Sequence, residues 1–156
     1  MNDYRGMLDG PLAIMKQYRQ FLLWTTIQDP GEEKPRKVPV DPRTGQIVDA
    51  HNPTYWVSAD EALGASAVHG LGVAFVFTET DKFFFVDIDK SWDGNRWTPQ
   101  AQYVFDLFQG AAFEISMSHT GAHLFGLSDH LAIPHRTKCE GLPGVELYTK
   151  KRFVAL

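Results

Sequence analysis

Two aspartates close an apolar run of the chain. Asp87 and Asp89 end the run 83–89 and are separated by Ile88. Alternate side chains of a β-strand share a face, so both carboxylates should point the same way, with their Cα atoms about 6.6 Å apart. Ionised carboxylates at that spacing repel each other unless a cation joins them, and Mg²⁺ and Mn²⁺ favour carboxylate oxygens. The aspartate pair therefore predicts a divalent metal site. The alternative is a strand end that simply reaches water.

A third carboxylate lies on a later predicted strand, 145–148. If Val145 and Leu147 face the core, strand alternation sends Glu146 and Tyr148 to the opposite face. Glu146 would then complete a metal site with the aspartate pair. An alternating glutamate on a half-exposed strand is also common without any function.

Ser118 and His123 flank a turn of small residues that contains further hydroxyls and Gly121. Such a turn presents backbone N–H groups and hydroxyls to an anion, and an imidazole can donate a hydrogen bond or carry positive charge. The segment predicts binding of a triphosphate; the alternative is a hairpin with a solvated tip, which we prefer for His119. His119 and His123 have the spacing of helical zinc ligands, but Gly121 between them argues against a helix there.

Spacing and turn signals predict the elements that must position these residues. Helices are expected at 11–20, from Ser58 to about Val68, where Ser58 and Glu61 form a capping-box signature, and from Thr98 through Phe108. The strands 73–78 and 83–89, separated by four polar residues, predict a hairpin. The other expected strands are 21–27, 37–40, 113–116, 123–127, 145–148 and 153–156.

This order of elements, with hairpins in place of regular crossover units, predicts an α+β domain with a largely antiparallel sheet. The length of 156 residues suits one compact domain spanning residues 1–156. The chain stops inside the apolar run 153–156, so we expect it to have been truncated from a longer protein.

Composition narrows the class of protein. The net charge of −4 argues mildly against a protein that coats duplex DNA, because such proteins usually have a basic surface. No apolar stretch is long enough to cross a membrane, and the N-terminus lacks the apolar core of a signal peptide. The single cysteine, Cys139, agrees with a reducing compartment. We therefore expect a cytoplasmic protein without a membrane partner.

In this order, the three polar segments resemble the motifs of the archaeo-eukaryotic primase superfamily, in particular the primase-polymerase domains of phage and plasmid replication proteins. In that family a D-x-D ends a hydrophobic strand, an S-x-H type motif lies in a glycine-containing turn, and a third acid follows on a later strand. The segments 37–42 and 152–156, and Trp24, also resemble this group. His119 departs from it, because relatives commonly have glycine there.

The resemblance implies an RRM-like sheet flanked by helices and a DNA primase and DNA polymerase activity. The reaction would be two-metal transfer of nucleotides from dNTPs or NTPs to a 3′ hydroxyl on a single-stranded DNA template, during phage or plasmid replication. Asp87, Asp89 and Glu146 would be catalytic and would bind two divalent ions, Mg²⁺ or Mn²⁺. Nucleotide-binding residues would be Ser118 and His123 at the phosphates, Tyr148 at the sugar region, and Lys37 and Arg152 as supporting cations.

Further expectations follow from the same resemblance. The partners would be the single-stranded template, the primer strand and the nucleotide, and a C-terminal helicase domain in the full-length protein. The location would be the cytoplasm of a bacterial host. Two other functions fit parts of the pattern. A non-catalytic single-stranded DNA or origin-binding module would keep the scaffold without the chemistry. A nucleotide-sugar glycosyltransferase also uses D-x-D with Mn²⁺, but usually has a longer nucleotide-binding half before the motif.

Overall fold

The computed structural model describes residues 4–128 and 137–156. The chain divides into two compact units, one formed by Met1–Val76 with Phe153–Leu156 and the other by Phe77–Arg152. Helices and antiparallel strand pairs occur in the chain, so the predicted α+β class is confirmed. Whether residues 1–156 act as one domain stays a prediction, as does the RRM-like arrangement. Within the described ranges, no helix combines the length and the apolar character that crossing a membrane requires.

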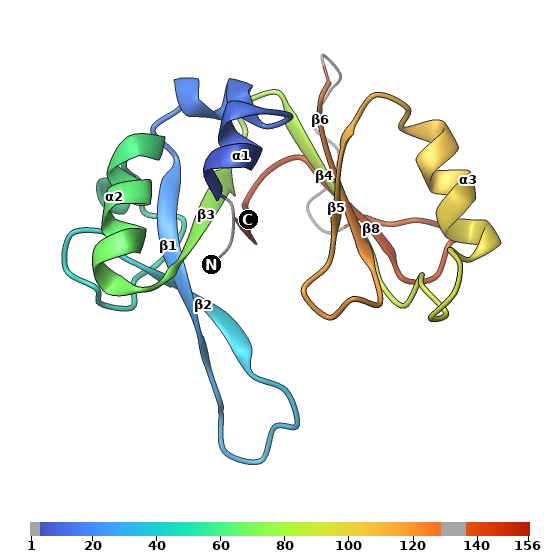
Figure 1. Ribbon diagram of the computed structural model, residues 1–156, viewed down its shortest axis with the longest axis horizontal. Helices are drawn as coiled ribbons and strands as arrows, with labels where there is room; N and C mark the ends of the chain where they lie inside the picture. Colours follow the sequence, from blue (N-terminus) through green and yellow to red (C-terminus); the bar gives the residue numbers. More distant parts are fainter. Residues whose placement is uncertain (1–3, 129–136) are drawn as a thin grey trace. The chain divides into compact units, whose positions relative to one another are not determined.

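The first unit contains a four-stranded sheet in the order β2-β1-β3-β9 (Figure 1). Its strands are β1 (Phe21–Ile27), β2 (Arg36–Val40), β3 (Gly72–Phe77) and β9 (Arg152–Ala155), and its helical segments are α1 (Tyr4–Asp9), η1 (Ala13–Gln17), η2 (Pro53–Tyr55) and α2 (Ala59–His69). The predicted capping box opens α2: the Ser58 hydroxyl accepts from the Glu61 N–H, and the Glu61 carboxylate accepts from the Ser58 N–H. The helix ends at Gly70 in the left-handed conformation.

The predicted helix over residues 11–20 is wrong in type and extent. The chain forms only the short 3₁₀ helix η1 there, preceded by α1, which the sequence did not predict. Leu12 and Met15 are buried, and their three-residue spacing matches the three residues per turn of a 3₁₀ helix. Two apolar positions at that spacing satisfy the shorter helix as well as an α-helix.

The second unit contains a five-stranded sheet in the order β5-β6-β4-β8-β7. Its strands are β4 (Phe83–Ile88), β5 (Ala112–Ile115), β6 (Ala122–Leu127), β7 (Thr137–Lys138) and β8 (Val145–Tyr148), with the helix α3 (Pro99–Leu107) between β4 and β5. The pairings of β4 with β6 and β8, of β5 with β6 and of β7 with β8 are antiparallel. The central strand β4 is rich in phenylalanine, valine and isoleucine, which suit a buried strand.

The predicted hairpin between residues 73–78 and 83–89 is wrong, because β3 and β4 belong to different sheets. β3 pairs with β1, whereas β4 pairs with β6 and β8. The connection is closed by Asp81, whose carboxylate accepts hydrogen bonds from the backbone N–H groups of Thr78 (2.7 Å) and Phe83 (3.0 Å). A polar turn between two apolar strands therefore reverses or redirects the chain without requiring the strands to pair.

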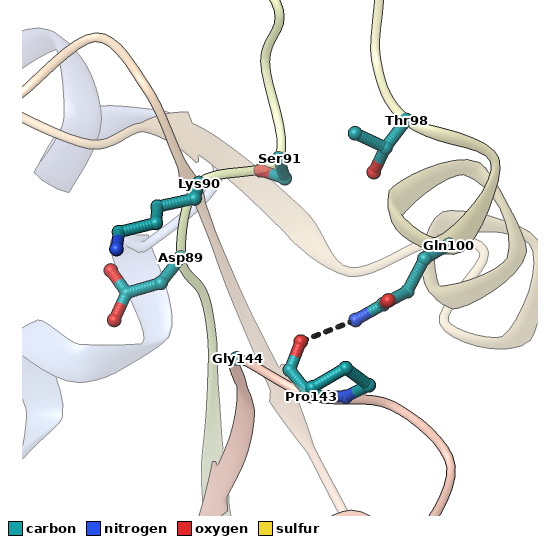
Figure 2. A pocket seen from close by; sticks show the side chains of 7 residues that line it. All are labelled: Asp89, Lys90, Ser91, Thr98, Gln100, Pro143 and Gly144. Carbon is teal, nitrogen blue, oxygen red and sulfur yellow. Dashed lines mark hydrogen bonds between the residues drawn. The ribbon is translucent and has the colours of Figure 1, made fainter.

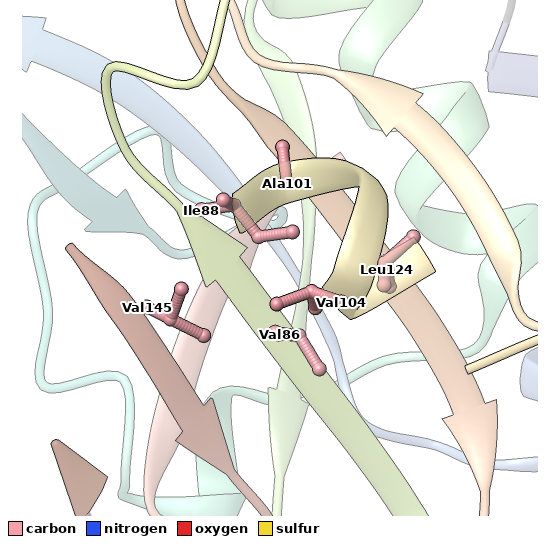
Figure 3. Packing of buried hydrophobic residues seen from close by; sticks show 6 residues of the cluster. All are labelled: Val86, Ile88, Ala101, Val104, Leu124 and Val145. Carbon is pink, nitrogen blue, oxygen red and sulfur yellow. The ribbon is translucent and has the colours of Figure 1, made fainter. Parts of the chain in front are cut away.

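One face of the second sheet is covered by α3. Figure 3 shows the apolar cluster in which strand residues such as Val86 and Ile88 pack against Ala101 and Val104 of the helix. The helix begins as predicted, with the Thr98 hydroxyl accepting from the Ala101 N–H at 3.2 Å and Pro99 in the first turn. Strand alternation then directs the intervening residue, Asp87, to the opposite face.

Candidate active site

A row of polar residues crosses the second sheet on the face opposite α3. Asp87 on β4 is paired with His123 on β6 and with Glu146 on β8. The row continues to Glu114 on β5 and to Lys138 on β7. Directly paired residues of neighbouring strands share a face of the sheet. We call this set of five residues the polar row. It contains two of the predicted acids, Asp87 and Glu146, and the predicted His123.

Asp87 lies among both cationic and acidic side chains. Its Oδ1 is 3.7 Å from Nε2 of His123, and its Oδ2 is 3.6 Å from Nη2 of Arg152. Burial raises the pKa of Asp87, and the nearby carboxylates of Asp89 and Glu146 raise it further, whereas His123 and Arg152 lower it. The net direction is upward. The negative charge of Asp87 is therefore incompletely compensated by the residues around it.

Asp89 is the first residue after β4, and it is exposed. Its backbone N–H donates to the carbonyl of Gly144 at 2.8 Å, which continues the contact between the β4 end and the segment before β8. Asp89 lines a pocket of about 410 Å³ with residues of the following loop and of α3 (Figure 2). It also lines a pocket of about 440 Å³ together with Glu146. Thus Asp89 and Glu146 border one hollow.

Figure 2 also shows how α3 is tied to the edge of this hollow. The Gln100 side chain donates a hydrogen bond to the carbonyl of Pro143 at 2.7 Å. Pro143 and Gly144 line both pockets. The contact therefore fixes the loop that faces Asp89.

The three predicted acids have the right chemistry for a hard divalent cation, since all their donors are carboxylate oxygens. Within residues 4–128 and 137–156, no three His, Cys, Asp or Glu side chains are grouped closely enough to hold a metal ion together. The repulsion that Asp89 and Glu146 exert on Asp87 is nevertheless what a cation between them would relieve. The donor set fits Mg²⁺ or Mn²⁺ by its charge and atom type.

Tyr148 and Arg152 support the acids from β8 and β9. The Tyr148 hydroxyl donates to Oε2 of Glu146, and the Tyr148 side chain is fully buried. The Arg152 guanidinium lies over the Tyr148 ring, with Cζ 4.1 Å from the ring centroid. Nε of Arg152 is buried and has no hydrogen-bond partner among the residues that the structure describes.

The predicted anion-binding turn is held by a chain of hydroxyls. Oγ of Ser118 lies 3.0 Å from Oγ of Ser116 and 2.8 Å from Oγ1 of Thr120. The turn is attached to the segment that follows the aspartate pair, because the N–H groups of Ser91 and Trp92 both donate to the carbonyl of Thr120, at 2.7 and 3.0 Å. These bonds bring the exposed Ser118 segment to the end of β4, as the predicted site requires.

His119 occupies the turn in a left-handed backbone conformation, with a φ angle of 56°. That conformation costs a non-glycine residue about 1–2 kcal/mol, and the glycine that the resemblance predicts at this position would avoid the cost. We expect His119→Gly to raise the free energy of unfolding by about 0.5–1 kcal/mol, after the entropy cost of glycine is subtracted. Chemical denaturation would measure the change. His51→Gly, at an exposed position whose φ is not positive, is the control and should give no gain; a similar gain in both variants would contradict the explanation.

Lys37 stays a predicted supporting cation, and Glu114 is a neighbour of His123 that the sequence did not predict. Lys37, predicted as a supporting cation, lies on β2 of the first unit, with its Nζ 5.0 Å from the ring centroid of Trp24. Glu114 was not predicted as a site residue, yet its Oε1 lies 2.9 Å from Nδ1 of His123. The register of the hairpin could have revealed it, since counting outward from the 116–121 turn places residue 114 opposite residue 123.

Comparison with known proteins finds a similar phage protein. No family model matches the chain. The chain is similar to a protein named DNA primase-polymerase from Nitratiruptor phage NrS-1, with 28% identity over 154 residues. The match covers 93% of this chain but only 20% of the phage protein, so the chain spans about a fifth of that relative's length. The predicted resemblance to phage primase-polymerases is confirmed by this similarity.

Proposed function

We propose that this chain, a relative of a phage primase-polymerase, carries a nucleotidyl-transfer site that adds nucleotides to a 3′ hydroxyl on a single-stranded DNA template. The observation that carries the proposal is the position of Asp87. It is paired with Glu146 on one side and with His123 on the other, and it lies 3.6 Å from Arg152. Acids suited to metal ions and side chains suited to phosphates therefore lie around Asp87.

Asp87, Asp89 and Glu146 would hold divalent cations, Mg²⁺ or Mn²⁺. When bound, these ions would neutralise charge on the triphosphate and favour ionisation of the primer 3′ hydroxyl. The Tyr148 hydroxyl, by donating to Glu146, fixes the orientation of that carboxylate. In this proposal Tyr148 acts through Glu146.

The phosphates would be bound on the other side of Asp87. Ser118 lies in a turn attached to the end of β4, and His123 directs Nε2 toward Asp87. The Arg152 side chain is 34% exposed, so its guanidinium supplies a further cation. These donors would hold phosphate oxygens through charge-assisted hydrogen bonds. Lys37, on the first unit, is proposed as an additional cation for nucleotide or template.

A primer-extension assay tests the proposal. The purified chain is incubated with a labelled primer on a single-stranded template, the four dNTPs and Mn²⁺ or Mg²⁺, and products are resolved on a denaturing gel. We expect template-dependent extension that EDTA abolishes and excess Mn²⁺ restores, because the carboxylates alone do not neutralise the triphosphate.

Parallel reactions separate the alternatives. Binding of labelled template without incorporation at any metal concentration would favour a non-catalytic DNA-binding module and contradict the proposal. Release of UDP from a UDP-sugar in Mn²⁺, without dNTP incorporation, would indicate a glycosyltransferase instead. The same assay tests each proposed partner in turn. Reactions omit the template or the primer, or replace dNTPs with NTPs.

A further inference from the structure

Glu114 and His123 form a close pair at the β5 end of the polar row. They are directly paired residues of β5 and β6, and Oε1 of Glu114 is 2.9 Å from Nδ1 of His123. Both side chains are largely buried, with exposed fractions of 20% and 11%. A carboxylate only accepts hydrogen bonds, so the proton of this bond is on Nδ1.

The pair leaves a single edge of the imidazole directed at the site. Nε2 faces Asp87 at 3.7 Å, too far for a hydrogen bond. The ring packs against Phe85 and Phe125, with centroid separations of 5.0 and 6.4 Å. With Nδ1 bonded and the ring in contact with two phenylalanines, rotation is restricted. Nε2 is thus the ring atom left to meet a phosphate, and it donates to a phosphate oxygen in the imidazolium form, in which both ring nitrogens carry protons.

The arrangement has a cost in stability. Oε2 of Glu114 is buried and has no hydrogen-bond partner among the described residues. An unsatisfied buried polar atom of this kind disfavours the folded state, and an apolar side chain at the same strand position would avoid the cost. Such locally unfavourable groups are concentrated at functional sites, where their contacts serve chemistry.

We infer that Glu114 is a positioning residue for His123: its carboxylate accepts from Nδ1–H and fixes the orientation of the ring, so that Nε2–H of the imidazolium meets a phosphate oxygen of the incoming nucleotide. The inference rests on the proposed function for the role of the phosphate. The orientation of the ring itself can be tested without any activity.

The kinetic test compares Glu114→Ala, Glu114→Gln, His123→Ala and the double alanine variant in primer extension. Partners that orient a functional histidine typically contribute about 10-fold or more, so Glu114→Ala should raise the KM for dNTP about 10-fold and change kcat less than about twofold. Because binding to phosphate is made before the transition state, the effect falls on KM. Glu114→Gln retains an acceptor oxygen and should recover most of the loss.

The double variant distinguishes positioning from a separate role. In the His123→Ala background, Glu114→Ala should have no further effect, because Glu114 acts through the imidazole. Glu33→Ala removes the same charge from an exposed loop and should leave the kinetics unchanged. An additive loss in the double variant, or a fall in kcat at constant KM, would overturn the inference.

Nitrogen-15 NMR gives the readout that needs no turnover. At a pH where the rings are neutral, the wild-type spectrum should show His123, assigned by its absence in His123→Ala, with the proton on Nδ1. Glu114→Ala should shift the ring to a mixture of tautomers, and Glu114→Val, which suits an edge strand, replaces it if the alanine variant does not fold. An unchanged tautomer would refute the inference, whereas absent incorporation with the expected spectra would refute only the proposed function.

Discussion

Asp87→Asn is expected to abolish nucleotide incorporation and at the same time raise the melting temperature of the chain. The catalytic part follows from the role proposed for the carboxylate. Asparagine keeps the shape but lacks the charge that would hold a divalent cation, and loss of several kcal/mol of transition-state stabilisation lowers the rate by about 10³-fold or more. We expect Asp89→Asn to have the same effect on incorporation.

The stability part follows from the pKa of Asp87, which is raised in the folded chain. The folded state therefore holds the proton of Asp87 to a higher pH than the unfolded state does. Stability contributed by this group falls as the pH rises from its ordinary pKa through the raised one. At neutral pH the ionised side chain disfavours folding, and a neutral asparagine removes this penalty.

Primer extension with added metal measures the effect on incorporation. Differential scanning calorimetry without added metal measures the effect on the melting temperature. Asp106→Asn is the matched control: it removes the same charge from an exposed position on α3 and should change neither incorporation nor melting by much. Incorporation at the wild-type rate by Asp87→Asn would remove the basis of the proposed function. A lower melting temperature would instead show that the attraction of His123 and Arg152 for Asp87 exceeds its burial cost.

Most of the polar row could be predicted because strand alternation is a local property. Asp87 stands between two apolar residues that pack against α3, and Glu146 stands between Val145 and Leu147, so each acid must point away from that helix. The turn with Ser118 was recognisable by its small residues and glycine. In each case the information lies within a few residues along the chain.

Pairing between distant strands could not be predicted in the same way. The segments 73–78 and 83–89 have the composition of a hairpin, yet each finds its partners elsewhere, and the choice depends on apolar surfaces that the local sequence does not contain. The contacts of Arg152 could not be derived from the local sequence either. Its contacts with Asp87 and Tyr148 depend on where the final strand is placed.

Gly121→Ala is expected to damage both the fold of the second unit and its activity. A Cβ at this position would lie 2.5 Å from the carbonyl oxygen of Ile88 and 3.1 Å from Oγ of Ser116. The φ of Gly121 is not positive, so the requirement for glycine is one of space. Because the first clash is with backbone at the end of β4, the strand itself must shift, and we expect a loss of about 2 kcal/mol in unfolding free energy.

That shift would move the aspartate pair relative to the turn that holds Ser118. A displacement of about 1 Å between reacting groups can lower a rate on the order of 100-fold, so incorporation should fall further than the loss of folded protein explains. Gly64→Ala on α2 is the control, because a Cβ there meets nothing within 4 Å; alanine should stabilise that helix by about 0.5–1 kcal/mol. Denaturation curves and primer extension at a temperature where both variants are folded would compare them. Wild-type stability and activity in Gly121→Ala would mean that the turn and the end of β4 do not approach as closely as the site requires.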